Sequence, residues 1–159
     1  MGMTIRQAVP GDEPALAELN GMVHALHVSA RPDVFSPVSA SALAEWYRGV
    51  LRNEHQRVWL AEIEGTSAGY LLAEIHERPA TLFSVPGRWC EIDQVGVDDG
   101  MRGQGVAHGL VETAIGWARG LGIQRVSAHC WSFNVAAQGA FASFGFAPVI
   151  VYLERVVSD

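Results

Sequence analysis

The stretch from Arg102 to Ala107 is the part of the sequence whose residue types and spacing most clearly indicate chemistry. It reads Arg-Gly-Gln-Gly-Val-Ala and lies where a β-rich segment ending at Val97 gives way to a helical pattern. A helix N-terminus exposes unpaired N–H groups and a partial positive charge, so it binds anions such as phosphate. Gly103 and Gly105 let the backbone approach the anion closely, and Arg102 adds a positive charge. A turn that only connects a strand to a helix has the same glycines, so the pattern alone favours neither interpretation.

Two other phosphate-binding motifs fit this stretch less well. A P-loop ends in Gly-Lys followed by Ser or Thr, which this sequence lacks. A dinucleotide-binding fold has glycines similar to Gly103, Gly105 and Gly109, but it also needs an acidic residue after the next strand to bind a ribose hydroxyl. That strand is predicted to end at Trp131 without an acid, and the chain offers one strand–helix–strand unit where such a fold needs several.

Two carboxylates on the preceding segment are the candidate catalytic groups. Glu91 and Asp93 are two residues apart, so a strand places both side chains on one face. Neighbouring carboxylates raise the pKa of one of the pair and attract a cationic amine. The alternative is a strand edge with two solvated acids, or an ion pair with Arg88 or Arg125.

Histidines and cysteines offer weaker candidates. His24 and His27 are three residues apart on a predicted helix, with no nearby acid or cysteine to complete a ligand set, so we expect no metal site. Cys130 suggests a thiol nucleophile, but a thiol in an apolar strand is more often buried and inert.

The elements that must position these residues follow from hydrophobic period and turn signals. A first helix is expected after the N-cap Asp12, with an apolar stripe from Leu16 to Leu26. Trp46 is expected to face inward from a second helix, over 39–52. Further helices are expected over 103–121 and 134–144, a loop over 81–88, and strands over 4–8, 57–64, 67–75, 89–97, 125–131 and 146–156. This order is typical of one α+β domain over 1–159, a mixed, mostly antiparallel sheet flanked by helices, with one parallel strand–helix–strand unit.

The length, composition and net charge of the chain exclude some classes of function. The chain has 159 residues, 49% of them apolar, and a net charge of -6. No apolar run reaches the roughly 20 residues that cross a bilayer, and no signal peptide is recognisable at the N-terminus, so we expect neither a membrane span nor secretion. Two cysteines indicate a reducing cytoplasm. The acidic balance argues against nucleic acid and is compatible with a cationic acceptor.

Two motifs in this sequence make the chain resemble the GNAT superfamily of N-acetyltransferases. Its acyl-CoA signature, Arg/Gln-x-x-Gly-x-Gly/Ala, is matched from Arg102 to Ala107. A second signature, Asn-x-x-Ala followed by a short helix and Gly-Phe, is matched between Asn134 and Phe146. The resemblance covers nearly the whole chain and implies a GNAT-like fold. It also implies acetyl-CoA as co-substrate and direct transfer of the acetyl group, in a ternary complex, to a primary amine of a small molecule or peptide.

The resemblance further implies how the cofactor is held. Backbone groups of Val95 and Val97 would pair with the pantetheine arm. Asn134 would hydrogen-bond the cofactor near its pantetheine or adenosine side, or serve as a helix N-cap, and the two roles do not exclude each other. The backbone amides that would hold the pyrophosphate belong to Gly103, Gln104, Gly105, Val106, Ala107 and His108.

Catalytic roles follow less completely from the family. Glu91 lies where some members carry a glutamate base, which puts it slightly ahead of Asp93. Many members protonate the departing thiolate with a tyrosine, and Phe141 occupies the matching position. Phe141 has no proton to give and would only pack against the cofactor. A thiol of pKa about 8.5 is a fair leaving group without an acid, and Ser143, a water or His129 remains open as a substitute.

The acceptor side is the least specified part of the prediction. The loop after the first helix often borders the acceptor pocket in this family, which makes His27 and Phe35 candidate acceptor contacts. A polyamine, an aminoglycoside-like drug, an amino acid and a protein N-terminus or lysine all remain open, as does the homodimer that is common in the family. The alternative function is a non-catalytic sensor or binding module for acyl-CoA.

Overall fold

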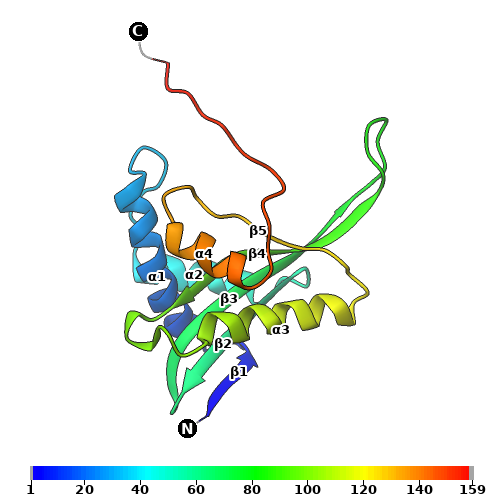
Figure 1. Ribbon diagram of the computed structural model, residues 1–159. Helices are drawn as coiled ribbons and strands as arrows, with labels where there is room; N and C mark the ends of the chain where they lie inside the picture. Colours follow the sequence, from blue (N-terminus) through cyan, green and yellow to red (C-terminus); the bar gives the residue numbers. More distant parts are fainter. Residues whose placement is uncertain (1, 158–159) are drawn as a thin grey trace. The chain divides into compact units, whose positions relative to one another are not determined.

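A computed structural model describes residues 2–157 of the chain (Figure 1). It divides into two compact units, Met1–His129 and Cys130–Asp159. The first unit contains a five-stranded sheet in the order β1-β2-β3-β4-β5. Its strands are β1 Met3–Gln7, β2 Gln56–Ile63, β3 Thr66–Arg78, β4 Gly87–Val97 and β5 Val126–Ala128. Its helices are α1 Glu13–Ala30, α2 Ala40–Val50, α3 Val106–Gly120 and the short 3-10 turn η1 Asp99–Met101.

The sheet is mixed in the way the sequence predicts. The first four strands pair antiparallel with their neighbours, and β4 pairs parallel with β5 through the crossover helix α3. Glu64 and Gly65, between β2 and β3, both have positive φ values, as a two-residue hairpin turn requires. The predicted fold class is therefore confirmed. The prediction of a single domain over 1–159 stays a prediction.

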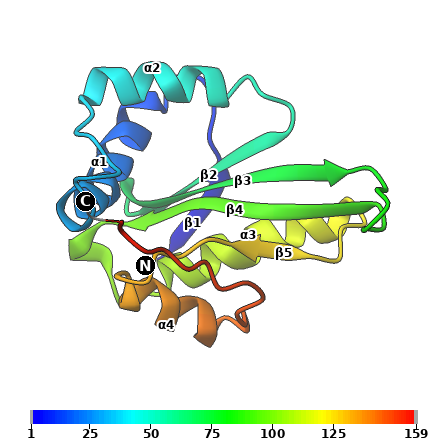
Figure 2. The same ribbon diagram turned by 90° about the horizontal axis from the view of Figure 1, so that it is seen from above.

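Helices cover both faces of this sheet. Figure 2 shows α1 and α2 over one face and α3 over the other. The α1/α2 face holds a continuous apolar cluster that includes Leu16, Tyr47, Leu60, Tyr70 and Leu72. On the other face of the sheet, α3 buries side chains that recur about once per helical turn: Val106, Leu110, Val111, Ala114 and Ala118. The strands between these layers are thus fixed on both sides.

The apolar stripes of the first two helices are only partly buried. Leu16 and Leu19 are buried, but Leu26, in the last turns of α1, is 54% exposed. Trp46 of α2, expected to face inward, is 45% exposed and packs its ring against Tyr47 instead. The spacing of apolar residues predicts which face of a helix points to the core, but the extent of the sheet beneath determines how much of that face is buried.

Three predicted elements differ most from the structure. α3 begins at Val106 and not at Gly103, because Gly103 and Gly105 adopt left-handed backbone angles that no α-helix contains. β5 has three residues where seven were expected. The segment over 146–156 forms no strand, and most of its apolar side chains are exposed. A β-forming composition is insufficient there, since a strand also needs a neighbour for its backbone hydrogen bonds.

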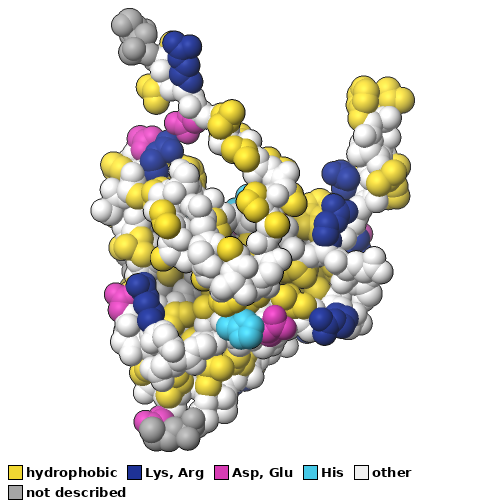
Figure 3. Space-filling view, in the orientation of Figure 1, with side chains coloured by type: hydrophobic (Ala, Val, Ile, Leu, Met, Phe, Trp, Pro, Cys, Tyr) yellow, Lys and Arg dark blue, Asp and Glu magenta, His cyan; other side chains and the backbone are white. Residues whose placement is uncertain are grey.

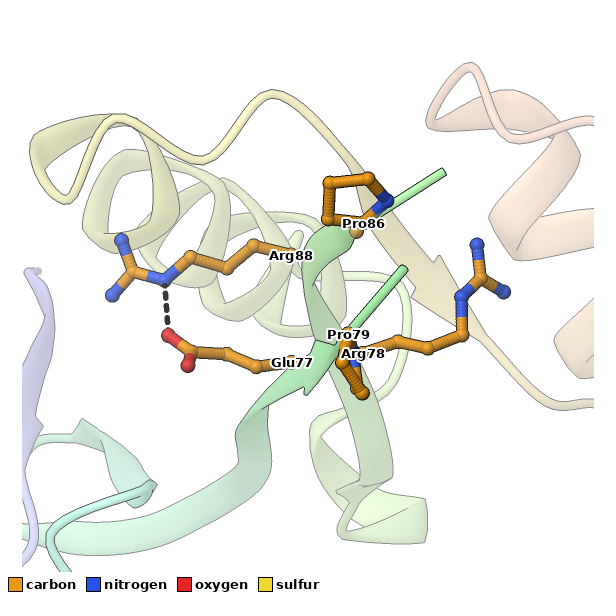
Figure 4. Close-up of a pocket in the computed structure, with 6 residues that line it drawn as sticks. Glu77, Arg78, Pro79, Pro86 and Arg88 are labelled. Carbon is orange, nitrogen blue, oxygen red and sulfur yellow. Dashed lines mark ion pairs between the residues drawn. The ribbon is translucent and has the colours of Figure 1, made fainter. Parts of the chain in front are cut away.

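The β3–β4 hairpin extends beyond the helices of the first unit (Figure 1). Its tip carries Leu82, Phe83 and Val85, each more than three-quarters exposed, and Figure 3 shows apolar side chains gathered there above basic ones. An open cavity of about 500 Å³ lies at the hairpin's neck, where Arg88 and Glu77 form an ion pair of 3.0 Å (Figure 4). It lies among strand ends and not at the glycine turn.

The second unit contains α4, Val135–Ser143, and an extended segment that follows it. Within this unit the ring of Phe141 packs against those of Phe144 and Phe146. Within residues 2–157, no helix of either unit is long and apolar enough to cross a membrane.

Candidate active site

The glycine turn is shaped by its backbone. Gly103 and Gly105 have φ values of +76° and +79°, a region that side-chain-bearing residues rarely adopt. Apart from the glycine and its chain neighbours, no residue has an atom within 4 Å of the position that a Cβ on either glycine would occupy. Gly105 is the N-cap of α3, and its carbonyl accepts the N–H of Gly109 at 2.9 Å. The earlier amides of the helix have no intrahelical acceptor, so the turn presents N–H donors around open space.

Charged side chains around the turn are exposed. Arg102 forms an ion pair of 2.7 Å with Asp99, and both side chains are largely solvent-accessible. His108, one turn into α3, lies 3.9 Å from Glu112. These side chains can adjust to a ligand, whereas the glycine backbone fixes where an anion would bind. The residues present fit the pyrophosphate of a coenzyme A thioester.

An irregularity in β4 lies just before the turn. Leu72 of β3 pairs with Gln94 of β4. The next residue, Ala73, pairs with Ile92, so Asp93 is left without a partner. An extra residue of this kind is a β-bulge, which redirects the side chains and backbone groups that follow it. No pattern in the residues of β4 indicates this bulge.

The bulge turns the later backbone groups of β4 towards the edge of β5. The Cys90 N–H donates to the Arg125 carbonyl beside β5. Because the backbone groups of successive residues point to opposite sides of a strand, a regular strand would then direct the N–H and C=O of Val95 towards β3. The Asp98 N–H, however, donates to the Ala68 carbonyl beside β3, which places the Val97 and Val95 groups on the opposite edge.

That edge is free of strand pairing. β5 pairs with β4 only over Cys90–Ile92, and no other strand among residues 2–157 pairs with this side of β4. The backbone N–H and C=O groups of Val95 and Val97 therefore make no strand pairing on this side. They stand immediately before the turn that presents the α3 amides.

Glu91 is held by two donors. Its Oε1 lies 2.9 Å from His129 Nδ1, and its Oε2 accepts a long hydrogen bond of 3.5 Å from Trp89 Nε1. The ring of Trp89 is in turn stacked on His76 of β3, with centroids 5.4 Å apart. The Glu91 side chain is 18% exposed, whereas that of His129 is 84% exposed. Glu91 thus sits in a fixed arrangement at the border of solvent.

Asp93 has a different environment. Partial burial raises the pKa of its carboxyl above the ordinary value, and the negative charges of Glu91 and Glu74 raise that pKa further. His129 and His76 act on it in the opposite direction. The negative charge of Glu91 thus acts on Asp93 and raises its pKa, whereas the common face of the two side chains stays a prediction.

A buried polar cluster supports β4 beside these acids. Gln94 Oε1 accepts hydrogen bonds of 2.8 Å from Asn20 of α1 and from the Tyr47 hydroxyl of α2. Asn20 also donates to the Tyr70 hydroxyl at 2.9 Å. Burial raises the pKa of both tyrosines, that of Tyr70 to about 12, so both hydroxyls keep their protons at neutral pH. The cluster ties both helices to the strand that carries Asp93.

The two predicted acceptor contacts lie together at the end of α1. The Phe35 ring packs edge-on against His27, with centroids 5.2 Å apart, and also against His24 at 6.1 Å. His24 Nε2 lies 2.7 Å from the Ser36 carbonyl, which holds the following loop against the helix. His27 Nδ1 lies 2.9 Å from the Val23 carbonyl. His27 and Phe35 therefore form one structural group, and acceptor contact stays a prediction for both.

The predicted residues of the second unit have local roles. The Asn134 side chain caps α4 by accepting the Ala137 N–H at 3.1 Å, so the N-cap interpretation is confirmed and cofactor contact stays a prediction. Phe141 packs against aromatic rings. Cys130 is exposed and follows β5, so the expectation of a buried strand cysteine is wrong. Strand β5 ends at Ala128, before Cys130 is reached.

Four residues near Glu91 and Asp93 were not predicted from the sequence to belong to the site. Glu74 and His76 come from β3, and Trp89 and Gln94 from β4. Cross-strand register brings them together: Glu74 lies opposite Glu91, and His76 opposite Trp89. Their alternation along β3 was visible in the sequence, but the register that pairs them with β4 was not.

The glycine turn, the free β4 edge and the neighbouring carboxylates are the features expected of an acyl-CoA-dependent transferase. A sequence model of the Acetyltransferase (GNAT) family matches residues 21–146. The chain therefore belongs to the GNAT acetyltransferase family and is an N-acetyltransferase. Comparison with curated protein sequences finds no significant match.

Solved structures share the fold at low sequence identity. A tetramutant of the BH1408 protein from Bacillus halodurans is 21% identical, with a TM-score of 0.92 over 97% of this chain and 99% of the other. Aminoglycoside N-acetyltransferase AAC(6')-Iy in complex with CoA is 19% identical, with a TM-score of 0.76 over 98% and 96%. Aminoglycoside 6'-N-acetyltransferase AAC(6')-Ih from Acinetobacter baumannii is 16% identical, with a TM-score of 0.76 over 99% and 100%.

Proposed function

We propose that the protein transfers an acetyl group from acetyl-CoA to a primary amine of a small molecule, by direct attack within a ternary complex. The observation that carries this proposal is the free edge of β4 at Val95 and Val97, which leads directly into the glycine turn. An extended chain that ends in a pyrophosphate fits this pair of features. The similarity to aminoglycoside acetyltransferases supports a small cationic acceptor.

The chemistry assigns separate tasks to the two parts of the site. The acceptor arrives as an ammonium ion, and Glu91 or Asp93 takes a proton from it directly or through water. The amine nitrogen then attacks the thioester carbonyl, so that a C–N bond forms and the C–S bond breaks. A backbone N–H near Val95 polarises the carbonyl oxygen by hydrogen bonding. The sulfur leaves as a thiolate and takes up the second proton of the amine, which is feasible without an acid at Phe141 because thiols have a pKa of about 8.5.

Acetyl-CoA is the co-substrate in this proposal, and the chain's own residues supply binding and proton transfer. The cytoplasm is the proposed location, which two free cysteines support. A homodimer is a further proposal, and sedimentation velocity of the purified protein tests it.

The direct test is a panel of amines assayed for release of free coenzyme A thiol. Acetyl-CoA should first raise the melting temperature, which establishes binding. A polyamine, an aminoglycoside, an amino acid and a peptide N-terminus then serve as acceptors, with acetyl-CoA alone as the hydrolysis control. We expect at least one small cationic amine to raise thiol release above hydrolysis and to yield an acetylated product by mass spectrometry. Stabilisation by acetyl-CoA with no acceptor-dependent release would support the sensor module instead.

Carboxylate variants separate binding from turnover. Glu91→Gln and Asp93→Asn should lower turnover while acetyl-CoA still raises the melting temperature as in the natural sequence. Glu54→Gln is the matched control, because Glu54 is exposed in the connection before β2. Loss of acetyl-CoA binding in the carboxylate variants would contradict the proposed division of the site.

A further inference from the structure

The two candidate bases differ in how their oxygens are engaged. Each oxygen of Glu91 faces a donor, His129 Nδ1 at 2.9 Å and Trp89 Nε1 at 3.5 Å. These donors engage both oxygens of the Glu91 carboxylate and compete with a substrate for them. Glu91 is therefore suited to carry a fixed negative charge.

Asp93 lacks such partners. Within the described part of the chain, its carboxylate makes no hydrogen bond and no ion pair. Asp93 is the extra residue of the bulge in β4, and the charges of Glu91, Glu74, His76 and His129 act on its carboxyl. Burial, and to a smaller extent the charge of Asp93, raises the pKa of the Tyr47 and Tyr70 hydroxyls, which belong to α2 and β3. Its oxygens are thus available to a substrate.

These contrasts decide between the two carboxylates, provided that the proposed acetyl transfer is correct. We propose that His129 and Glu91 form a dyad that holds Glu91 as a fixed negative charge, and that Asp93 is the group that accepts the proton of the acceptor amine. In this assignment Asp93 is the catalytic residue, and Glu91 and His129 are positioning residues. The raised pKa of Asp93 is in keeping with it, because a base with greater proton affinity removes the ammonium proton more readily.

The proton transfer balances without a further reactant. The ammonium nitrogen gives one proton to the Asp93 carboxylate and keeps a lone pair, which forms the C–N bond as the C–S bond breaks. The departing thiolate takes up a second proton from the nitrogen. Asp93 then returns its proton to solvent, so one proton is released for each acetyl group transferred.

The test compares pH profiles of kcat/KM with one fixed acceptor. Because the acceptor's own pKa is common to all variants, differences between their acid limbs report the enzyme. Asp93→Asn should lower kcat about 100-fold or more and remove the part of the acid limb that comes from Asp93, which leaves only the ionisation of the acceptor. Glu91→Gln removes a charge that raises the Asp93 pKa, so its acid limb should move to lower pH. His129→Ala removes a neighbour that lowers that pKa, so its acid limb should move to higher pH.

Conservative and matched variants distinguish a positioning role from a structural one. His129→Asn keeps an N–H donor near the position of Nδ1 and should recover part of the kcat lost in His129→Ala. His55→Ala is the matched control, because His55 is exposed in the connection before β2. Loss of the enzyme's part of the acid limb in Glu91→Gln, with that part retained in Asp93→Asn, would overturn the assignment.

A second measurement needs no turnover and tests the dyad alone. NMR of the histidine ring nitrogens at a pH of about 9, where imidazoles are neutral, should show His129 protonated at Nδ1. Glu91→Ala should return His129 to the tautomer protonated at Nε2, which free imidazole side chains prefer. A His129 tautomer that does not respond to Glu91→Ala would contradict the dyad. Failure of the proposed acetyl transfer would leave this NMR result unchanged, so the two outcomes are distinguishable.

Discussion

The glycine turn from Arg102 to Ala107 and the carboxylate group around Asp93 belong to one unit but are built in opposite ways. The turn depends on backbone conformation at Gly103 and Gly105, within six consecutive residues. The carboxylate group depends on side chains from β3, β4 and the residue that follows β5. A backbone-built site tolerates changes in most of its side chains and fails when a glycine is replaced. A side-chain-built site should respond to loss of a single functional group while its fold is preserved.

The largest effect is expected from Gly105→Val. A β-branched residue at a φ of +79° costs about 1–2 kcal/mol, and relief of this strain would turn the amides away from the ligand. With the loss of charged hydrogen bonds, we expect acetyl-CoA affinity to fall about 100-fold, equivalent to about 2.7 kcal/mol, by isothermal titration calorimetry. Gly116→Ala, on the exposed face of α3, is the control and should leave affinity unchanged. Full affinity in Gly105→Val would show that the backbone of the turn is dispensable.

A second change tests where the turn and β4 meet. A Cβ on Gly69 of β3 would lie 2.7 Å from the Gly96 carbonyl oxygen and 2.9 Å from Val106 Cγ1. Backbone atoms cannot yield as a side-chain end can, so Gly69→Ala should lower the free energy of unfolding by about 1–3 kcal/mol. Urea denaturation measures this, and an unchanged midpoint would contradict the tight packing of α3 on the sheet.

A smaller effect is expected from Arg102→Ala. The Arg102 side chain is exposed and already paired with Asp99, so its contribution to anion binding is screened by solvent. Acetyl-CoA affinity should fall about 3- to 10-fold at low salt, and the difference should shrink as salt is added. A loss as large as that of Gly105→Val would mean that the turn also depends on its side chains.

These expectations also show what the sequence reveals. The conformation of the turn could be predicted from the sequence because glycine is the residue that most readily adopts left-handed backbone angles. The residues of the motif are also consecutive. The two-residue spacing of Glu91 and Asp93 led us to expect that their charges interact, and the common face of their side chains stays a prediction. The bulge at Asp93 and the contact of Glu91 with His129 were not readable, because they depend on register between segments distant in sequence. The predicted strand over 146–156 failed for the same reason, since a strand requires a partner that composition does not specify.

The smallest expected effect is that of Asp93→Asn on the melting temperature and its dependence on pH. Because the folded-state pKa of Asp93 is raised, the folded protein binds this proton more tightly than the unfolded chain. Stability from this group is therefore present at low pH and is lost as pH rises through the folded-state pKa. Asp93→Asn should raise the melting temperature at neutral pH, measured by calorimetry, and should weaken its dependence on pH in the acidic range. A lower melting temperature at neutral pH would contradict the environment assigned to Asp93.

The division between the two parts of the site is tested most directly by measuring acetyl-CoA affinity and kcat side by side for Gly105→Val and Asp93→Asn. Gly105→Val should weaken acetyl-CoA binding about 100-fold. Asp93→Asn should bind acetyl-CoA as the natural sequence does and lose about 100-fold or more in kcat. The opposite pattern, with affinity lost in Asp93→Asn and retained in Gly105→Val, would contradict an acetyl-CoA site built from the turn and a proton acceptor built from the bulge.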